Sequence, residues 1–338
     1  MESLEIKLLG TREIHFCDSP VRGYVVANVK TPSIAAAALE IEFSGTYWFR
    51  NALGKYQSEI FASYRQDLYL NGVVGGFECG KYESPFAFFL EPTFPSSVAC
   101  AGGSVQYKLV ARCTYKLASC LATDHTIEET KYLSVIQLLD VEKLAVAHLG
   151  AIARQSGGNS WVTCCWRNSL DLYLRTKRRA YVCGEYILAS VSIPNMTEID
   201  DVELRLVQVV ETILNRRYKT IISSKQLTYR PQRAAGWHDE QLRVPALPPS
   251  TFDKNMTISY CLELEAKRIR SYTASITLTI GSKPLEDLSI DSVILEKSFV
   301  FPGTVNLKEE AYAFIPSYPV YNFTDNSGNP SACAETDV

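Results

Sequence analysis

Two adjacent cysteines near the middle of the chain are the residues most suggestive of redox or metal chemistry. Cys164 and Cys165 lie between Trp161 and Trp166. Neighbouring side chains on an extended chain point to opposite sides, and structural zinc sites usually pair ligands two to four residues apart. The nearest further cysteine, Cys183, has no partner close in sequence. The pair is therefore interpreted as small apolar surface packed near the tryptophans, with metal binding and a vicinal disulfide as the alternatives.

No other residues form a recognisable catalytic set. The four histidines are dispersed, at His15, His125, His148 and His238. None of them lies in a zinc-protease or phosphate-binding motif. The net charge of −3 gives no overall attraction to nucleic acid or to anionic membrane. The sequence predicts a protein that is not an enzyme, uses no cofactor or metal and binds no nucleic acid.

A basic run in the second half suggests anion binding. The run Leu170–Tyr181 has strand character, and a period of two places Arg175, Lys177 and Arg179 on one face. Cations spaced by about 7 Å suit phosphates of a phosphorylated tail or of phosphoinositide headgroups. A second cluster follows, at Arg216, Arg217 and Lys219. The alternative is a solvated strand face balanced by nearby aspartates.

The C-terminus carries a short recognition pattern. Thr336 and Val338 end the sequence as Thr-x-Val, the pattern that a PDZ groove reads through an added strand, a carboxylate nest and an apolar pocket. The polar, Gly- and Pro-bearing residues before it favour a disordered, accessible tail. The alternative is a chance match, because three-residue patterns arise easily.

Strand patterns dominate the elements that must position these residues. Leu39–Phe43, Ile258–Ala266 and Ser275–Ile280 alternate apolar and polar residues with the period of half-buried strands. The one good helical composition, Val141–Gln155, is interpreted as an interdomain connector. The sequence therefore predicts an all-β protein.

An internal repeat predicts two copies of one domain. Gly23 and Gly184 each precede a strand, a proline turn and a second strand, and Pro95-Ser96 and Pro249-Ser250 each precede a long strand. A period of about 155 residues is too long for a solenoid and fits two β-sandwiches.

The predicted organisation has four parts. They are an N-terminal sandwich at 1–142, a linker at 143–160, a C-terminal sandwich at 161–315 and a flexible tail at 316–338. The N-terminus lacks the pattern of a signal peptide, and there is no apolar run long enough to span a membrane. We therefore expect a reducing compartment and free thiols.

Several stretches together resemble the alpha-arrestin family of arrestin-domain-containing proteins. In the first half they are Phe43–Phe49 and Ser84–Ala111; in the second they are Cys164–Trp166, Ala180–Asn195, Leu242–Glu265 and Leu278–Leu285. The resemblance implies two tandem immunoglobulin-like β-sandwich domains, the arrestin fold, with a short disordered C-terminal tail. The sequence departs from the family where Cys183 replaces a turn proline. It departs again where Ile315–Tyr318 lacks the first proline of a Pro-Pro-x-Tyr motif.

The same resemblance implies the function. It suggests a cytoplasmic trafficking adaptor, recruited transiently to plasma membrane or endosomes, that binds cytoplasmic tails of membrane proteins. It also suggests a link to endocytic, sorting or ubiquitin-ligase machinery, although direct ligase recruitment is in doubt without a Pro-Pro-x-Tyr motif. PDZ-domain proteins and phosphoinositide headgroups are further candidate partners. The alternatives are a structural, retromer-like subunit of a trafficking complex and, more remotely, an enzyme.

Overall fold

The structure is a computed structural model. It describes residues 3–10, 14–30, 34–51, 53–68, 79–117, 120–157, 170–194, 201–214, 216–228, 236–267, 271–285, 290–299 and 310–323. Residue contacts divide the chain into two compact units. Unit 1 comprises Met1–Ala99, Gly103–Gln137 and Leu307–Pro316, and unit 2 comprises Cys100–Gly102, Leu138–Asn306 and Ser317–Val338.

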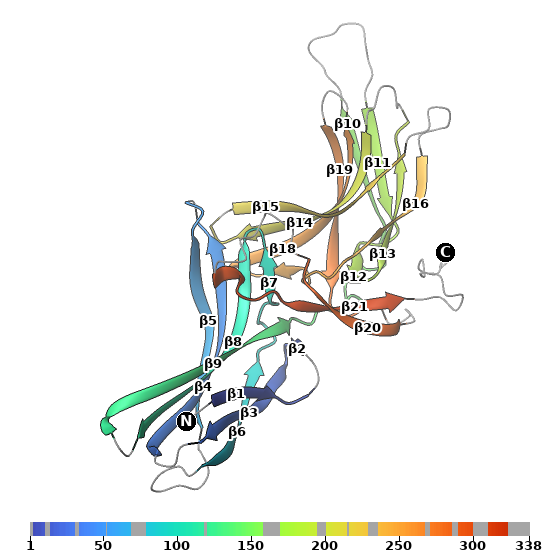
Figure 1. Ribbon diagram of the computed structural model, residues 1–338. Helices are drawn as coiled ribbons and strands as arrows, with labels where there is room; N and C mark the ends of the chain where they lie inside the picture. Colours follow the sequence, from blue (N-terminus) through green and yellow to red (C-terminus); the bar gives the residue numbers. More distant parts are fainter. Residues whose placement is uncertain are drawn as a thin grey trace. The chain divides into compact units, whose positions relative to one another are not determined.

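Unit 1 consists of two sheets (Figure 1). The smaller sheet has the order β1-β3-β6, with β1 at Ser3–Leu8, β3 at Ser19–Val29 and β6 at Gly80–Leu90. The larger sheet has the order β2-β9-β8-β4-β5, with β7 paired to β8. Its strands are β2 at Ile14–Phe16, β9 at Cys120–Ile136, β8 at Gly103–Leu117, β4 at Ile34–Arg50, β5 at Tyr56–Leu68 and β7 at Val98–Cys100. A short 3-10 helix, η1, spans Glu310–Tyr312.

The core of unit 1 lies between these sheets. Leu39, Ile41 and Phe43 of β4 are buried as the alternation predicts, while the glutamates between them are partly exposed. The ring of Phe43 lies 5.8 Å from that of Phe88 on β6 and 5.8 Å from that of Tyr107 on β8. The aromatic contacts therefore join the inner faces of the two sheets, as in a β-sandwich.

Unit 2 repeats this plan. One sheet has the order β10-β11-β13-β16, with β10 at Ala151–Gly157, β11 at Leu170–Thr176, β13 at Tyr186–Ser192 and β16 at Gly236–Arg243. The other has the order β12-β19-β18-β14-β15, with β17 paired to β18. Its strands are β12 at Ala180–Val182, β19 at Ser271–Gly281, β18 at Met256–Lys267, β14 at Asp201–Thr212, β15 at Arg216–Gln226 and β17 at Thr251–Phe252. The larger sheets of the two units thus have matching strand orders, which confirms the predicted duplication and the all-β fold class.

Matching hydrogen bonds show which residues of the two halves are equivalent. The buried hydroxyl of Tyr107 donates to the carbonyl of Pro95 at 2.6 Å, and that of Tyr260 donates to the carbonyl of Pro248 at 2.7 Å. The prediction matched Pro95 with Pro249, one residue too far along. The correct register is set by these tyrosines, each of which bonds a carbonyl twelve positions earlier.

The turn that opens each sandwich is also repeated, but at different residues from those predicted. Cys17 donates its Sγ hydrogen to the carbonyl of Phe94 at 3.4 Å, and Cys183 donates to that of Leu247 at 3.3 Å. The next residue has a positive φ in both units, 64° at Asp18 and 98° at Gly184. Asp18, not Gly23, is therefore the counterpart of Gly184.

Gly184 is constrained by a close backbone contact in addition to its positive φ. A Cβ at Gly184 would collide with the backbone carbonyl of Tyr321, which packs against this turn in unit 2. Glycine is required there both for its positive φ and for this close approach.

The predicted connector helix at Val141–Gln155 is wrong. Successive backbone bonds, from Leu144 N to Val141 O and from Ala147 N to Leu144 O, form turns with a spacing of three residues. β10 follows and pairs with β11. Because Val141 and Ala147 are buried in a cluster of unit 2, the described part of the predicted 143–160 linker belongs to that unit.

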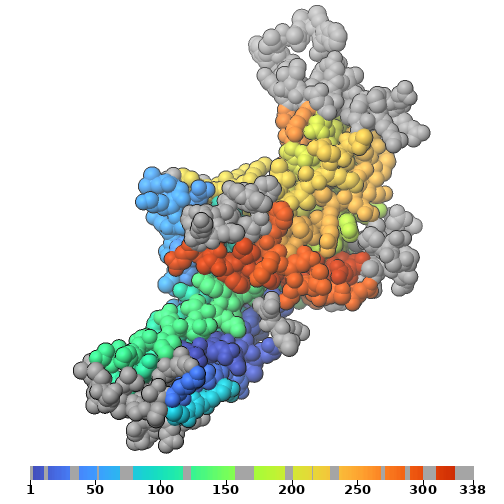
Figure 2. Space-filling view, in the orientation of Figure 1, coloured from blue at the N-terminus to red at the C-terminus, as the bar shows by residue number. Residues whose placement is uncertain are grey.

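The predicted flexible tail at 316–338 begins too early. Ser317–Phe323 forms β21, which pairs with β20 at Ile290–Lys297. Tyr318 and Val320 are buried in unit 2, so their burial holds the strand in place. The partner strand β20 lies at the surface (Figure 2). The rest of the predicted tail, 324–338, lies outside the described residues.

Candidate functional site

The structure divides the predicted basic strand in unit 2. β11 ends at Thr176, and the chain then crosses to the other sheet, where β12 pairs with β19. Arg175 is exposed on β11 and Lys177 is exposed just after it, whereas Arg179 is half-buried and its carbonyl accepts a bond from Thr279 N at 2.8 Å. The prediction of one strand face for the three cations is therefore wrong, because the chain changes sheets between them.

The one tightly built ion pair in this run involves a residue that the sequence analysis did not select. Arg178 Nη2 lies 2.9 Å from Glu185 Oε1, and the guanidinium lies 5.0 Å from the ring centre of Tyr181. Glu185 Oε2 also accepts a bond from Val182 N at 2.8 Å. Burial raises the pKa of the Glu185 carboxyl, and the charge of Arg178 offsets part of that rise. The pair holds the turn between β12 and β13.

The second predicted cluster lies on β15, in the other sheet of the sandwich. Arg217 Nε lies 3.3 Å from Glu211 Oε1, and Lys219 Nζ lies 2.9 Å from Glu263 Oε1. Arg216 alternates with them and is half-buried. Outer faces of two packed sheets point in opposite directions. The structure therefore does not bring the two clusters together into one phosphate-binding surface.

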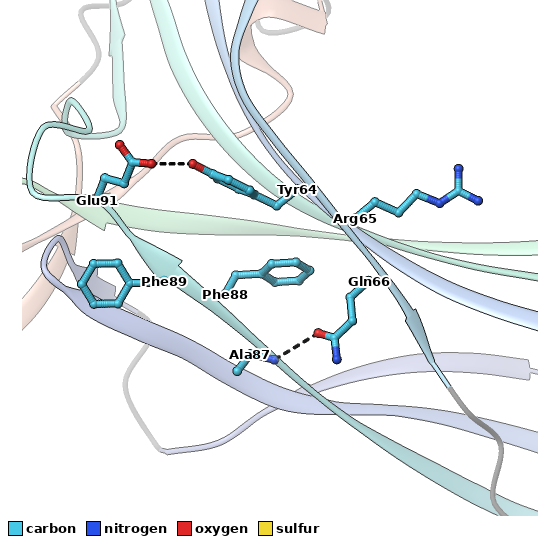
Figure 3. A pocket seen from close by; sticks show the side chains of 7 residues that line it. All are labelled: Tyr64, Arg65, Gln66, Ala87, Phe88, Phe89 and Glu91. Atoms are coloured by element: carbon cyan, nitrogen blue, oxygen red, sulfur yellow. Dashed lines mark hydrogen bonds between the residues drawn. The ribbon is translucent and has the colours of Figure 1, made fainter.

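A groove between two strand edges of unit 1 offers a different binding site (Figure 3). It has a volume of about 410 Å³. Tyr64, Arg65 and Gln66 line it from β5, and Ala87, Phe88 and Phe89 line it from β6, with Glu91 following that strand. Among the strands that the structure describes, β5 and β6 each end a sheet, so the groove is the open mouth of the sandwich.

The backbone of β6 points hydrogen-bonding groups into this mouth. Ala87 is opposite Arg22 of β3, whose carbonyl instead accepts from Leu9 N on the far side at 2.8 Å. Opposed residues of an antiparallel ladder either bond each other or both face away. The N–H and C=O of Ala87 therefore face the groove, as do those of Phe89 by alternation. Pro85 has the same orientation, at an edge position where proline is tolerated.

Two side-chain bonds currently span the groove. Ala87 N donates to Gln66 Oε1 at 3.5 Å, and the Tyr64 hydroxyl donates to Glu91 Oε1 at 2.6 Å (Figure 3). The bond to Glu91 is the main cause of a raised pKa at Tyr64. The long Gln66 contact is a weak hydrogen bond. An incoming backbone carbonyl could therefore replace it at little cost.

Aromatic rings form the floor of the groove. The ring of Phe43 lies 6.1 Å from that of Tyr64 and 5.8 Å from that of Phe88, which connects the floor to the core. Phe89 is 53% exposed and Tyr64 is 38% exposed. The site thus combines outward-facing backbone groups with accessible aromatic surface, which suits the binding of an extended peptide.

The sequence contained a signal for this site that was not used. In Phe86–Leu90 the alternation is broken by Phe89, an aromatic residue at an outward position. A large exposed apolar side chain on an edge strand is informative because it adds contact surface beside free backbone groups.

The other predicted sites cannot be placed. Trp161, Cys164, Cys165 and Trp166 lie outside the described residues, as do Thr336 and Val338. Within the described ranges, no group of three or more His, Cys, Asp or Glu side chains is arranged to hold a metal ion. No helix of the described part is long and apolar enough to cross a membrane.

Comparison with protein-family models gives a match within the second half of the chain. Residues 166–285 match the model of the arrestin (or S-antigen) C-terminal domain. The matched region contains strands β11 to β19 of unit 2.

Proposed function

Because the chain is an arrestin-domain-containing protein, we propose that it is a cytoplasmic trafficking adaptor that binds membrane-protein cargo. In this proposal it acts by binding alone, without catalysis, and it links cargo to endocytic, sorting or ubiquitin-ligase machinery. The membership supports an adaptor role in general. The observation that carries the proposal is the groove between β5 and β6, where backbone groups of Ala87 face an open edge.

In the proposed mechanism, an extended cytoplasmic segment of the cargo adds as a strand to β6. The added strand bonds the outward N–H and C=O groups of Ala87 and Phe89, and one of its side chains packs on the aromatic floor. Backbone bonds supply affinity in this mode, and the pockets for alternate side chains supply specificity.

The proposal is tested with a proline at the groove edge. Ala87→Pro removes an N–H that makes only a weak bond to Gln66, so the fold is expected to persist. Glu83→Pro is the matched control, since it removes an N–H of the same orientation on β6 outside the groove lining. The assay is capture of the full chain on an array of cytoplasmic segments from membrane proteins. We expect Ala87→Pro to lose segments that the control retains; identical capture by both variants rejects this site as the cargo site.

A further inference from the structure

The charges around the groove restrict what its ligand can be. Strands β5 and β6 with Glu91 carry four carboxylates and two cations, a net charge of −2. Both cations are engaged: Arg65 pairs with Glu40, and Lys81 pairs with Glu83. In Figure 3, Arg65 points away from the other lining side chains, while Glu91 stands at the rim. The field at this site therefore favours a cationic ligand and disfavours a phosphorylated one.

The backbone restricts the length of the ligand. Pro85 has no N–H to offer at the edge, and β6 ends at Leu90. Complete pairs of outward donor and acceptor groups are thus present at Ala87 and Phe89. A strand that pairs with both covers about three residues, or about five with its flanks. The ligand segment is short.

The floor selects the central side chain. On an added strand, the residue that faces inward lies over Phe88 and Tyr64, which contact the core through Phe43. An apolar side chain there buries surface against aromatic rings, whereas a polar one loses its hydration without a partner.

We propose that the groove binds a short extended segment with one apolar residue flanked by lysine or arginine. In this proposal the side-chain carbonyl of Gln66 competes with the backbone carbonyl of that segment for Ala87 N. This ligand class rests on the proposed cargo function. Cytoplasmic segments next to membrane spans are enriched in Lys and Arg, so they supply this pattern. The side-chain carbonyl of Gln66 occupies the position on Ala87 N that the ligand's backbone carbonyl takes. Binding exchanges one bond for the other.

The test uses the full chain and fluorescent nine-residue peptides, read by polarisation at low and moderate salt. The first peptide has a central leucine flanked by lysines; the others replace the lysines by glutamate or by phosphoserine. We expect the lysine peptide to bind tightest and to weaken with salt. Gln66→Ala is expected to tighten binding by about 2-fold, because a weak competing hydrogen bond is removed. Loss of a merely structural residue would not tighten binding.

Two further variants complete the test. Glu91→Gln keeps an acceptor for Tyr64 and removes the rim charge, so binding should weaken about 2- to 5-fold with a smaller salt dependence. Ala87→Pro should abolish binding of the lysine peptide, and Glu83→Pro should not. Equal or tighter binding of the phosphoserine peptide, or unchanged affinity in Gln66→Ala, overturns this inference. If the peptides contradict this ligand class but Ala87→Pro still loses membrane-protein segments on the array, the groove remains the proposed cargo site and only the ligand class is rejected.

Discussion

Removing the buried carboxylate of Glu185 should destabilise unit 2 far more than removing an exposed one. Glu185 is 4% exposed on its side chain and bonds both Arg178 and Val182 N. Glu185→Ala leaves a nearly buried guanidinium and a buried N–H without this acceptor. Breaking a buried pair from one side costs about 3–5 kcal/mol. For a domain of this size, that corresponds to a fall in Tm of about 6–20 °C.

The reverse truncation, Arg178→Met, adds a dependence on pH. Without the guanidinium, burial raises the pKa of Glu185 further above its unfolded value. A carboxyl whose folded pKa is raised contributes stability below the unfolded pKa and loses it as pH rises through the folded pKa. The deficit of Arg178→Met relative to the natural chain should therefore be larger at pH 7.5 than at pH 5. The double variant Arg178→Met with Glu185→Leu should be more stable than either single variant, because it buries no charge.

The assay is urea unfolding of the full chain with hydrogen exchange read separately on β12 and β18. Glu211→Ala is the control, because its pair with Arg217 is more than half exposed on both sides and is worth at most about 1 kcal/mol. Equal destabilisation by Glu185→Ala and Glu211→Ala would refute the reasoning. So would a double variant no more stable than the singles.

Three further predictions concern other sites. Burial, and secondarily the charge of Lys131, lowers the pKa of His15, so unit 1 should lose stability as pH falls below about 6.5, and His15→Phe should remove that loss in a pH series of melts. With iodoacetamide at pH 8, the exposed Cys79 should react before the buried thiols of the described residues, as peptide mass spectrometry can show. Among these buried thiols, burial raises the pKa to about 11 or 12 at Cys17, Cys113, Cys183 and Cys261. Charge reversal at Arg175 and Lys177 should reduce binding to phosphoinositide vesicles if that exposed pair contacts headgroups; unchanged binding removes it as a candidate.

The strands and the duplication were predictable because local patterns in the sequence reveal them. Leu39–Phe43 and Ile258–Ala266 alternate with period two, and each strand buries the residues that the pattern assigns inward. The exact register of the repeat was not predictable from glycine and proline alone. It depends on long-range bonds such as Tyr107 to Pro95 and Tyr260 to Pro248, which no local pattern reveals.

The error in the basic run falls where the chain moves between sheets. The period-two pattern of the sequence continues from Leu170 to Tyr181. In the structure, pairing in the first sheet ends at Thr176, and pairing in the other sheet begins at Ala180. After this crossing Arg178, which no prediction selected, pairs with the buried Glu185. The groove was missed because it lies between β5 and β6, which end two different sheets. No local sequence pattern predicts which sheet edges lie beside each other.

The duplication itself argues that the open groove is a specialised feature of unit 1. Ile41 of β4 and Leu204 of β14 are equivalent, because they pair with Ala111 and Leu264, which keep the same spacing as the two core tyrosines. Across the next ladder, Ile41 pairs with Gln66 and Leu204 pairs with Lys225.

At this equivalent position the two units make different bonds. Lys225 Nζ in unit 2 forms a 2.7 Å ion pair with Glu240 of β16, which joins the two edges through side chains. In unit 1, Gln66 instead makes a 3.5 Å contact with the backbone of Ala87. The same fold thus admits an ion pair across its mouth. Its replacement in unit 1 by a weak, neutral bond to the edge backbone is what a site that must open for a strand requires.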